Sequence, residues 1–241
     1  MIPGCGKGYD VVLFAAHGYD AYGLEVSSHA ADAARKYLED PGKGPVQGEY
    51  AVRDEKVGKG AMKVVSGDYF DDAWLKDVEG WDGDEGFDII YDNTVSVSYQ
   101  RRHCTDILQF LCALPPTLRP KWASRTASLL RHPSTNSTLS GGVLICLEFP
   151  THKPVSSGGP PWSLPPLVHA ELLKRPGQDI QYNDQGVVKK TDAEETDHAL
   201  VKIAHYTPRR THDVGVIKGL VRDCVSMWRH KVDCPEGVRW H

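Results

Sequence analysis

The chain has 241 residues, of which 40% are hydrophobic, and it carries a formal net charge of −4. This length and hydrophobic content allow one substantial core, so we expect a single domain over residues 1–241. The acidic balance argues against a nucleic-acid partner, because affinity for nucleic acids depends on clustered Lys and Arg. The short basic runs at 101–103, 189–190 and 209–210 are interpreted as solvated surface.

The six cysteines show no paired spacing, which indicates reduced thiols in a cytoplasmic protein. The sequence starts without a signal-peptide pattern, and no apolar run reaches the roughly 18 residues of a membrane-spanning helix. We therefore expect a cytoplasmic monomer that acts on a small molecule and binds neither membrane nor nucleic acid.

The first segment, Pro3–Asp10, is a glycine-rich turn that leads into a helix-like stretch at 11–17. Glycines at alternate positions (Gly4, Gly6 and Gly8) remove side chains where a strand-to-helix turn brings its backbone close to a ligand. The next apolar run ends at Glu25, a residue type that accepts hydrogen bonds from ribose hydroxyls. This pattern is typical of a nucleotide-cofactor loop.

Two features bear on which nucleotide is bound. A dinucleotide fingerprint starting at Gly4 would carry its third glycine at position 9, where the chain has Tyr9, so the spacing disfavours NAD. Asp68 lies beside aromatic residues just past a predicted strand, where its carboxylate can accept from the exocyclic amine of adenine. The alternative role for Asp68 is the N-cap of a helix at 71–78.

Apolar segments alternate with helical stretches along the chain. Strands are predicted at 21–26, 62–66, 87–91 and 142–149, and helices at 29–39 (with Ser27 as N-cap), 117–130 and 166–174. This order predicts an α/β fold with a largely parallel sheet covered on both faces. Strands at 198–206 and 224–229 would close the far edge of the sheet as an antiparallel pair.

The connecting segments differ in composition. Those at 41–60, 77–86 and 177–197 are charged, glycine-rich and without apolar periodicity, so we expect exposed loops away from the chemistry. Pro150–Pro166 instead mixes Pro, Gly and Ser with Trp162. It follows the carboxyl end of a strand, where open α/β sheets bind ligands, and is suited to act as a lid over a pocket.

These residues resemble the class I S-adenosylmethionine-dependent methyltransferases, and among them the thiopurine, thiol and halide methyltransferase group in its fungal form. The likeness runs through 3–10, 22–27, 67–70, 87–92, 110–116, 119–123, 141–150 and 156–161 and ends near 228–229. It implies a Rossmann-like, mostly parallel, seven-stranded-type sheet. It also implies S-adenosylmethionine as cofactor and a thiol, a thiopurine-like molecule or a halide as methyl acceptor.

The same resemblance implies a set of site residues. Cofactor-binding positions are Gly4, Cys5, Gly6, Gly8, Asp10, Glu25, Asp68, Tyr69 and Asp92. Asp92 and Arg119 are also implied at the methyl-transfer site, where Arg119 would steer an anionic acceptor. The alternative for Arg119 is an exposed helix arginine. Glu25 stands where Asp is commoner in the family, a replacement that keeps the carboxylate.

The implied reaction is an in-line displacement at a methyl group already activated by a sulfonium. It needs no metal, and a thiolate or halide nucleophile needs no strong base. Three histidines, His198, His205 and His212, recur at intervals of seven. In a strand this odd spacing puts His198 and His205 on opposite faces, so we expect no metal site.

Two features depart from the family pattern. Family members carry an N-terminal helical cap with a cofactor-contacting tryptophan and then the first strand, whereas only Met1 and Ile2 precede the glycine turn here. We therefore expect a truncated chain that lacks the cap and most of the first strand. Residues 95–109 separate segments that run together in the family, and they are interpreted as a retained intron or a genuine surface insertion.

A catalytically inactive fragment or binding protein is the alternative to an active enzyme, and an NAD-dependent oxidoreductase is the third hypothesis.

Overall fold

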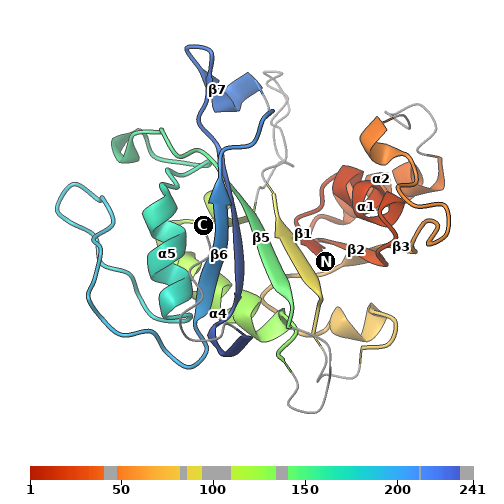
Figure 1. The fold of residues 1–241 in the computed structure, drawn as a ribbon, viewed down its shortest axis with the longest axis horizontal. Coiled ribbons are helices and arrows are strands. Elements are labelled where there is room, and N and C mark those ends of the chain that lie inside the picture. The colour runs from red at the N-terminus through yellow and green to blue at the C-terminus, as the bar shows by residue number, and fades with distance from the viewer. Residues whose placement is uncertain (41–47, 82–85, 94–109, 134–140, 212, 234–241) are drawn as a thin grey trace. The chain divides into compact units, whose positions relative to one another are not determined.

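The computed structural model describes residues 1–40, 48–81, 86–93, 110–133, 141–211 and 213–233 (Figure 1). They form two compact units, Met1–Trp81 and the described residues from 86 onward. The predicted insertion at 95–109 lies outside the described residues, as do Cys104, His212 and Cys234.

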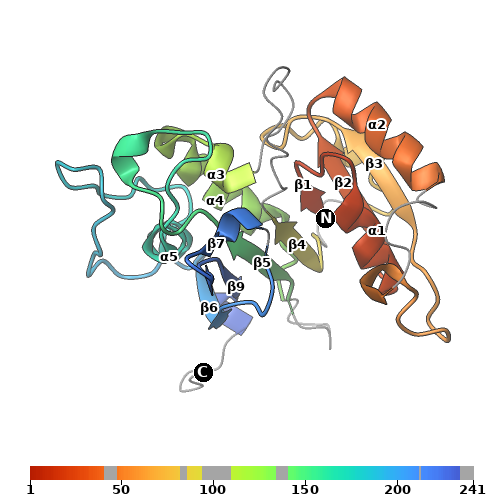
Figure 2. The same cartoon turned by 90° about the horizontal axis from the view of Figure 1, so that it is seen from above.

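The first unit contains a parallel three-stranded sheet in the order β1-β2-β3. Its strands are β1 (Ile2–Pro3), β2 (Ala21–Glu25) and β3 (Met62–Ser66), and its α-helices are α1 (Tyr9–Ala16) and α2 (Ser28–Glu39). The two helices lie side by side (Figure 2), and the rings of Tyr9 and Tyr37 meet edge to face at 4.9 Å between centroids. Both crossovers are βαβ units, as the alternating sequence predicts.

The start of α2 follows from its capping residue. The Ser27 hydroxyl accepts a hydrogen bond from the Ala30 N–H at 3.3 Å, which satisfies one of the backbone donors that a helix leaves unpaired at its first turn. The inner face of α2 carries the small side chains of Ala31 and Ala34, both fully buried, so the helix packs closely on the unit's core. The predicted cap is confirmed.

The second unit contains a mixed four-stranded sheet in the order β4-β5-β9-β6. Strands β4 (Ile89–Asp92) and β5 (Val143–Glu148) are parallel, whereas β9 (Cys224–His230) runs antiparallel to both β5 and β6 (Leu200–Tyr206). The predicted antiparallel pair at the sheet edge is therefore confirmed. The α-helices are α3 (Phe110–Ala113), α4 (Arg119–Leu129) and α5 (Pro166–Lys174), and a small hairpin joins β7 (Val216–Ile217) to β8 (Leu220–Val221).

Strand β5 is the central element of the second unit. Leu144, Cys146 and Glu148 are fully buried and alternate with half-buried residues, so they share the inner face of the strand. A carboxylate thus occupies the end of a row of core positions. One-turn 3-10 helices complete the described structure, at Gly48–Tyr50, Leu75–Asp77, Pro116–Leu118, Val155–Ser157, Asp213–Gly215 and Lys231–Asp233.

The predicted α/β class is confirmed, with two local differences. The helix expected over 117–130 is divided into the turn Pro116–Leu118 and α4, with Pro120 in the first turn of α4, where a missing N–H is tolerated. The helix considered at 71–78 is only the single turn Leu75–Asp77. No helix among the described residues is both long and apolar enough to span a membrane. A single domain with one seven-stranded-type sheet stays a prediction.

Candidate functional site

The glycine turn, Pro3–Asp10, connects β1 to α1 and depends on residues without a side chain. Gly4, Gly6 and Gly8 have φ angles of 63°, 53° and 78°, in the left-handed region that favours glycine. Gly8 is the N-cap of α1, and its N–H donates to the Cys5 carbonyl at 2.9 Å. The alternate glycines that the sequence analysis singled out are therefore required by the backbone itself.

Glu25 holds this turn against the sheet. Its Oε2 accepts from the Gly6 N–H at 3.1 Å and its Oε1 accepts from the Ser27 N–H at 3.0 Å. The side chain is only 9% exposed. A carboxylate has about four acceptor positions, so two remain for a ligand. Because β1 and β2 are parallel, the turn and Glu25 lie at the same edge of the sheet.

Asp68 and Tyr69 follow β3 at that same edge. The Gly67 N–H donates to the Glu25 carbonyl at 3.0 Å, which ties this third segment to the first two. The exposed Asp68 carboxylate accepts from the Phe70 N–H at 2.9 Å, so it closes a short turn and caps no helix at 71–78. Tyr69 is 3% exposed and its ring meets that of Phe70 edge to face.

Cys5 and Asp10 have structural roles in the turn. Cys5 packs on Gly23 of β2 so closely that a β-carbon at Gly23 would lie 2.6 Å from Cys5 Sγ. Burial, reinforced by the Glu25 carboxylate, raises the pKa of the Cys5 thiol to about 12. Asp10 lies in the first turn of α1, where the helix dipole favours a carboxylate.

Asp92 ends β4 in the second unit and is 6% exposed. Burial raises the pKa of its carboxyl group to about 7, although hydrogen bonds from the Leu111 backbone and the Trp122 side chain oppose the rise. Its Oδ2 has no hydrogen-bond partner within the described part of the chain. An unpaired oxygen on a buried carboxyl group is unusual for a purely structural residue.

Arg119 opens α4 and is 2% exposed, so the alternative of an exposed helix arginine is wrong. Its Nη2 donates to the Ser163 carbonyl at 3.2 Å. Burial lowers the pKa of the guanidinium, and the neighbouring Tyr182 hydroxyl opposes that shift. The group remains a cation at physiological pH, because arginine starts from a pKa above 12.

A small cavity of about 30 Å³ lies beside Arg119. Its walls are largely apolar, and its lining residues are Pro116, Arg119, Val155, Trp162, Ser163, Pro165, Val168, Tyr182, Gly186 and Val188. Pro150–Pro166 supplies four of them, and its two ends are joined by a hydrogen bond from the Leu164 N–H to the Pro150 carbonyl at 3.0 Å. This segment therefore lines a pocket, and its action as a lid stays a prediction.

The expectation that 177–197 is an exposed loop is wrong at several of its residues. Tyr182, Gly186 and Val188 from this segment line the Arg119 cavity, and a β-bridge pairs Tyr182 with Val188. Val188 is 6% exposed, and Ile180 is 8% exposed. A few apolar residues anchor the segment, and they are too sparse to give a periodic signal among its many charged neighbours.

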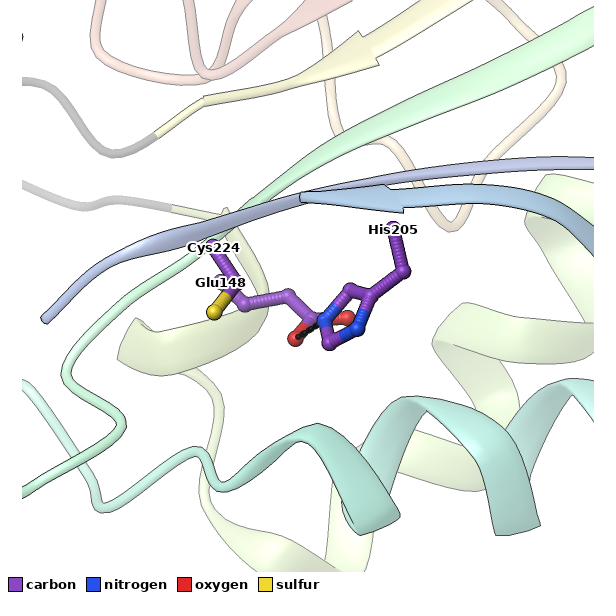
Figure 3. A group of neighbouring side chains, drawn as sticks. All are labelled: Glu148, His205 and Cys224. Carbon is purple, nitrogen blue, oxygen red and sulfur yellow. Dashed lines mark hydrogen bonds and ion pairs between the residues drawn. The ribbon is translucent and has the colours of Figure 1, made fainter. Parts of the chain in front are cut away.

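The second unit also gathers three potential metal ligands that the sequence analysis did not connect (Figure 3). One ligand atom each from Glu148, His205 and Cys224 lies within 4.8 Å of the other two. His205 Nε2 is 3.0 Å from Glu148 Oε2, and burial raises the pKa of the Cys224 thiol. His169 of α5 lies beside them with Nδ1 3.8 Å from Glu148 Oε1, and burial lowers its pKa to about 4 despite the carboxylate.

Comparison with known proteins identifies related sequences. A family model described as thiopurine S-methyltransferase matches residues 1–211. Probable thiol methyltransferase 2 of Arabidopsis thaliana is 30% identical over 173 residues, which are 72% of this chain and 55% of that protein. Thiocyanate methyltransferase 1 of Arabidopsis thaliana is 28% identical over 202 residues, 83% of this chain and 62% of that protein. The chain thus spans less than two thirds of the length of these curated relatives.

Solved structures are more distant in sequence. A crystal structure of an S-adenosylmethionine-dependent methyltransferase from Methanosarcina mazei is 13% identical, with a TM-score of 0.49 over 94% of this chain and 89% of that one.

Proposed function

Because the chain belongs to the thiopurine S-methyltransferase family, we propose that it binds S-adenosylmethionine and transfers the methyl group to a small soft nucleophile. The acceptor class is a thiol, a thiopurine-like molecule or a halide. The observation that carries the proposal is the glycine turn, in which Gly4, Gly6 and Gly8 adopt left-handed backbone conformations. Glu25 fixes that turn at the carboxyl edge of a parallel sheet, the usual place for a nucleotide in an open α/β sheet.

The residues at this edge fit the cofactor. A β-carbon added at Gly6 would meet no atom within 4 Å, so there is space in front of the loop backbone. The remaining lone pairs of Glu25 can accept from the ribose hydroxyls, and the exposed Asp68 carboxylate can accept from the adenine amine. When bound, S-adenosylmethionine supplies a methyl group that its sulfonium sulfur has already activated. Asp68 and Glu25 then orient it without taking part in bond making.

The Arg119 cavity fits the smallest acceptors in this class, a halide or a small thiolate. Its volume of about 30 Å³ admits only a small group, because a cavity needs roughly 10–15 Å³ to hold one water molecule. The buried guanidinium favours an anion such as a halide or a thiolate. The apolar walls, including Trp162 and Val168, offer an anion few hydrogen-bond donors, and loss of hydration raises the reactivity of a small anion.

Isothermal titration calorimetry with S-adenosylhomocysteine tests the cofactor assignment. The wild-type protein should bind it and should not bind NAD. Gly6→Val should abolish binding, because valine disfavours a φ of 53° and fills the space in front of the turn.

Gly58→Val is the matched control. Gly58 also has a positive φ, 76°, and open space around its α-carbon, but it lies in the connection that precedes β3 and outside the glycine turn. This variant should carry similar backbone strain and keep the wild-type affinity. Binding of NAD alone would support the oxidoreductase, and binding of neither ligand would support a catalytically inactive protein. Full affinity in a folded Gly6→Val protein would place the cofactor elsewhere.

A further inference from the structure

Glu148 is a buried carboxylate with incomplete pairing. Its side chain is 0% exposed. Oε2 lies 3.0 Å from His205 Nε2, whereas Oε1 has no hydrogen-bond partner within the described part of the chain. Burying a charge without full compensation is costly, so a carboxylate in this state indicates a missing positive partner.

The strand register explains why other donor groups meet at Glu148. Glu148 of β5 is paired directly with Cys224 of β9, and His205 of β6 is paired with Ser226, two residues further along β9. Because side chains alternate along a strand, Cys224 and Ser226 point to the same face of the sheet. Figure 3 shows Glu148, His205 and Cys224 converging on the side of α5, the helix that carries His169.

We propose that Glu148, His205 and Cys224 bind a divalent cation of the zinc class. A carboxylate oxygen, an imidazole nitrogen and a thiolate sulfur are the three donor types that Zn²⁺ takes from proteins. The carboxylate and the thiolate together carry two negative charges, which balance a divalent ion. On binding, the Cys224 thiol releases its proton to solvent, and no group is oxidised or reduced. The site is independent of the methyl-transfer proposal.

The distances suit such an ion. In a tetrahedral site with bonds of about 2.0–2.3 Å, ligand atoms lie roughly 3.3–3.8 Å apart. The Glu148 and His205 atoms, 3.0 Å apart, would separate slightly, and the widest separation in the group is within 4.8 Å, so side-chain movements of about 1 Å bring the three atoms to tetrahedral spacing. The His205 side chain is 31% exposed, which gives an ion a path from solvent. His169 Nδ1 lies 3.8 Å from the other carboxylate oxygen, too far for a hydrogen bond, and a small movement would allow one that orients Glu148.

Cobalt titration of the full chain, stripped with a chelator, tests the proposal. Co²⁺ takes the same ligands as Zn²⁺ and reports a bound thiolate through a sulfur-to-cobalt absorption band in the near ultraviolet. We expect one Co²⁺ per chain with this band, displacement by Zn²⁺, and a higher melting temperature with either metal.

The variants replace Cys224 and His205, which are partly exposed, because Glu148→Gln would change a core residue and could prevent folding. Cys224→Ser should lose the absorption band, and His205→Asn should weaken Co²⁺ affinity at least tenfold. His198→Asn is the matched control, since His198 is exposed, lies just before the same strand and is outside the group, and it should bind like wild type. The melting temperature of each variant in chelator confirms folding. Absence of stoichiometric binding, or a band that persists in Cys224→Ser, would overturn the site.

Discussion

Glu25 joins two backbone turns through the two oxygens of one carboxylate, so its proposed role in cofactor binding and its role in the fold are inseparable. Glutamine is nearly the same size but has one acceptor oxygen and one amide group. In Glu25→Gln the amide would therefore face the N–H of Gly6 or Ser27, and one hydrogen bond would be lost. We expect S-adenosylhomocysteine affinity to fall at least tenfold and stability to fall by about 1–3 kcal/mol. Calorimetry and urea unfolding measure the two effects.

Asp20→Asn is the control for Glu25→Gln. Asp20 precedes β2, and its exposed carboxylate accepts a single hydrogen bond, from the Ala61 N–H at 2.8 Å. An asparagine keeps that acceptor oxygen, so cofactor affinity should not change. A folded Glu25→Gln protein with the wild-type dissociation constant would show that the ribose is held by other groups.

Asp92 makes stability depend on pH in a direction opposite to that of a salt-bridged aspartate. Its pKa is about 7 in the folded protein against 3.8 for the free group, so between these values the folded state binds more protons than the unfolded state. The protonated Asp92 carboxyl group therefore contributes to the free energy of unfolding. That contribution is complete below about pH 4 and is lost as the pH rises through 7. Asp92→Asn should flatten the slope, as measured by urea unfolding between these pH values.

The exposed Asp77, the last residue of the turn Leu75–Asp77, provides the comparison for Asp92. Asp77→Asn should keep the pH slope of the wild-type protein. An unchanged slope in Asp92→Asn would mean that the carboxyl group is not protonated in the folded state at neutral pH.

Arg119 is the positive group of the proposed acceptor pocket. Replacing it with methionine keeps much of the side-chain volume but removes the charge. A charge-assisted hydrogen bond contributes about 1.5–3 kcal/mol, so Arg119→Met should raise the KM for an anionic acceptor roughly 10- to 100-fold. The rate of methyl iodide or methyl thioether formation at varied acceptor concentration gives the KM.

Arg125→Met, on the same helix but outside the pocket lining, should leave the KM unchanged. Equal KM values for both variants would show that Arg119 does not bind the acceptor.

At the scale of elements, the start of α2 is stabilised by one side chain, the N-cap Ser27. Ser27→Ala removes the hydroxyl that accepts from the Ala30 N–H and should destabilise the protein by about 1 kcal/mol in chemical denaturation. Ser28→Ala, one position into the helix and exposed, is the control and should have little effect. Because the Glu25 contact uses the Ser27 backbone N–H, cofactor affinity should survive the change in both variants. A Ser27→Ala protein as stable as wild type would contradict the assigned cap.

Sequence patterns predict an element well when local chemistry defines its ends. β3 and α5 have the predicted bounds, Met62–Ser66 and Pro166–Lys174, because an apolar run or an N-terminal proline marks them. The edge proposed to bind the cofactor is equally predictable, because parallel strands place Glu25 and Asp68 at one edge of the sheet.

Contacts across antiparallel strands are less accessible to sequence reasoning. Glu148, His205 and Cys224 meet only through the register of β5, β9 and β6, and a shift of one residue would turn a side chain to the other face. The sequence does place an acidic residue, Glu148, at the end of an apolar strand, and a buried carboxylate needs a positive or hydrogen-bonding partner. The sequence spacing of the histidines relates His205 only to His198 and gives no indication of Glu148 or Cys224 as its neighbours.

At the scale of the whole molecule, the two compact units raise the question of cooperativity. If they behave as the predicted single domain, differential scanning calorimetry should show one transition whose calorimetric and van't Hoff enthalpies agree. S-adenosylhomocysteine at about 100 times its dissociation constant should then stabilise the protein by about 2.7 kcal/mol and raise the melting temperature by roughly 5–10 °C. Two resolved transitions, with only one shifted by the ligand, would contradict a single cooperative domain.

The burial of Cys5 has a consequence for the proposed methylation of a thiol. Such a reaction brings a strong electrophile to a protein that itself contains thiols. Only the thiolate attacks readily, and with a pKa of about 12 the Cys5 thiol has almost none at neutral pH. Cys146 is fully buried and its pKa is also raised. Under the proposed activity, burial keeps both thiols protonated and thereby protects them from self-methylation.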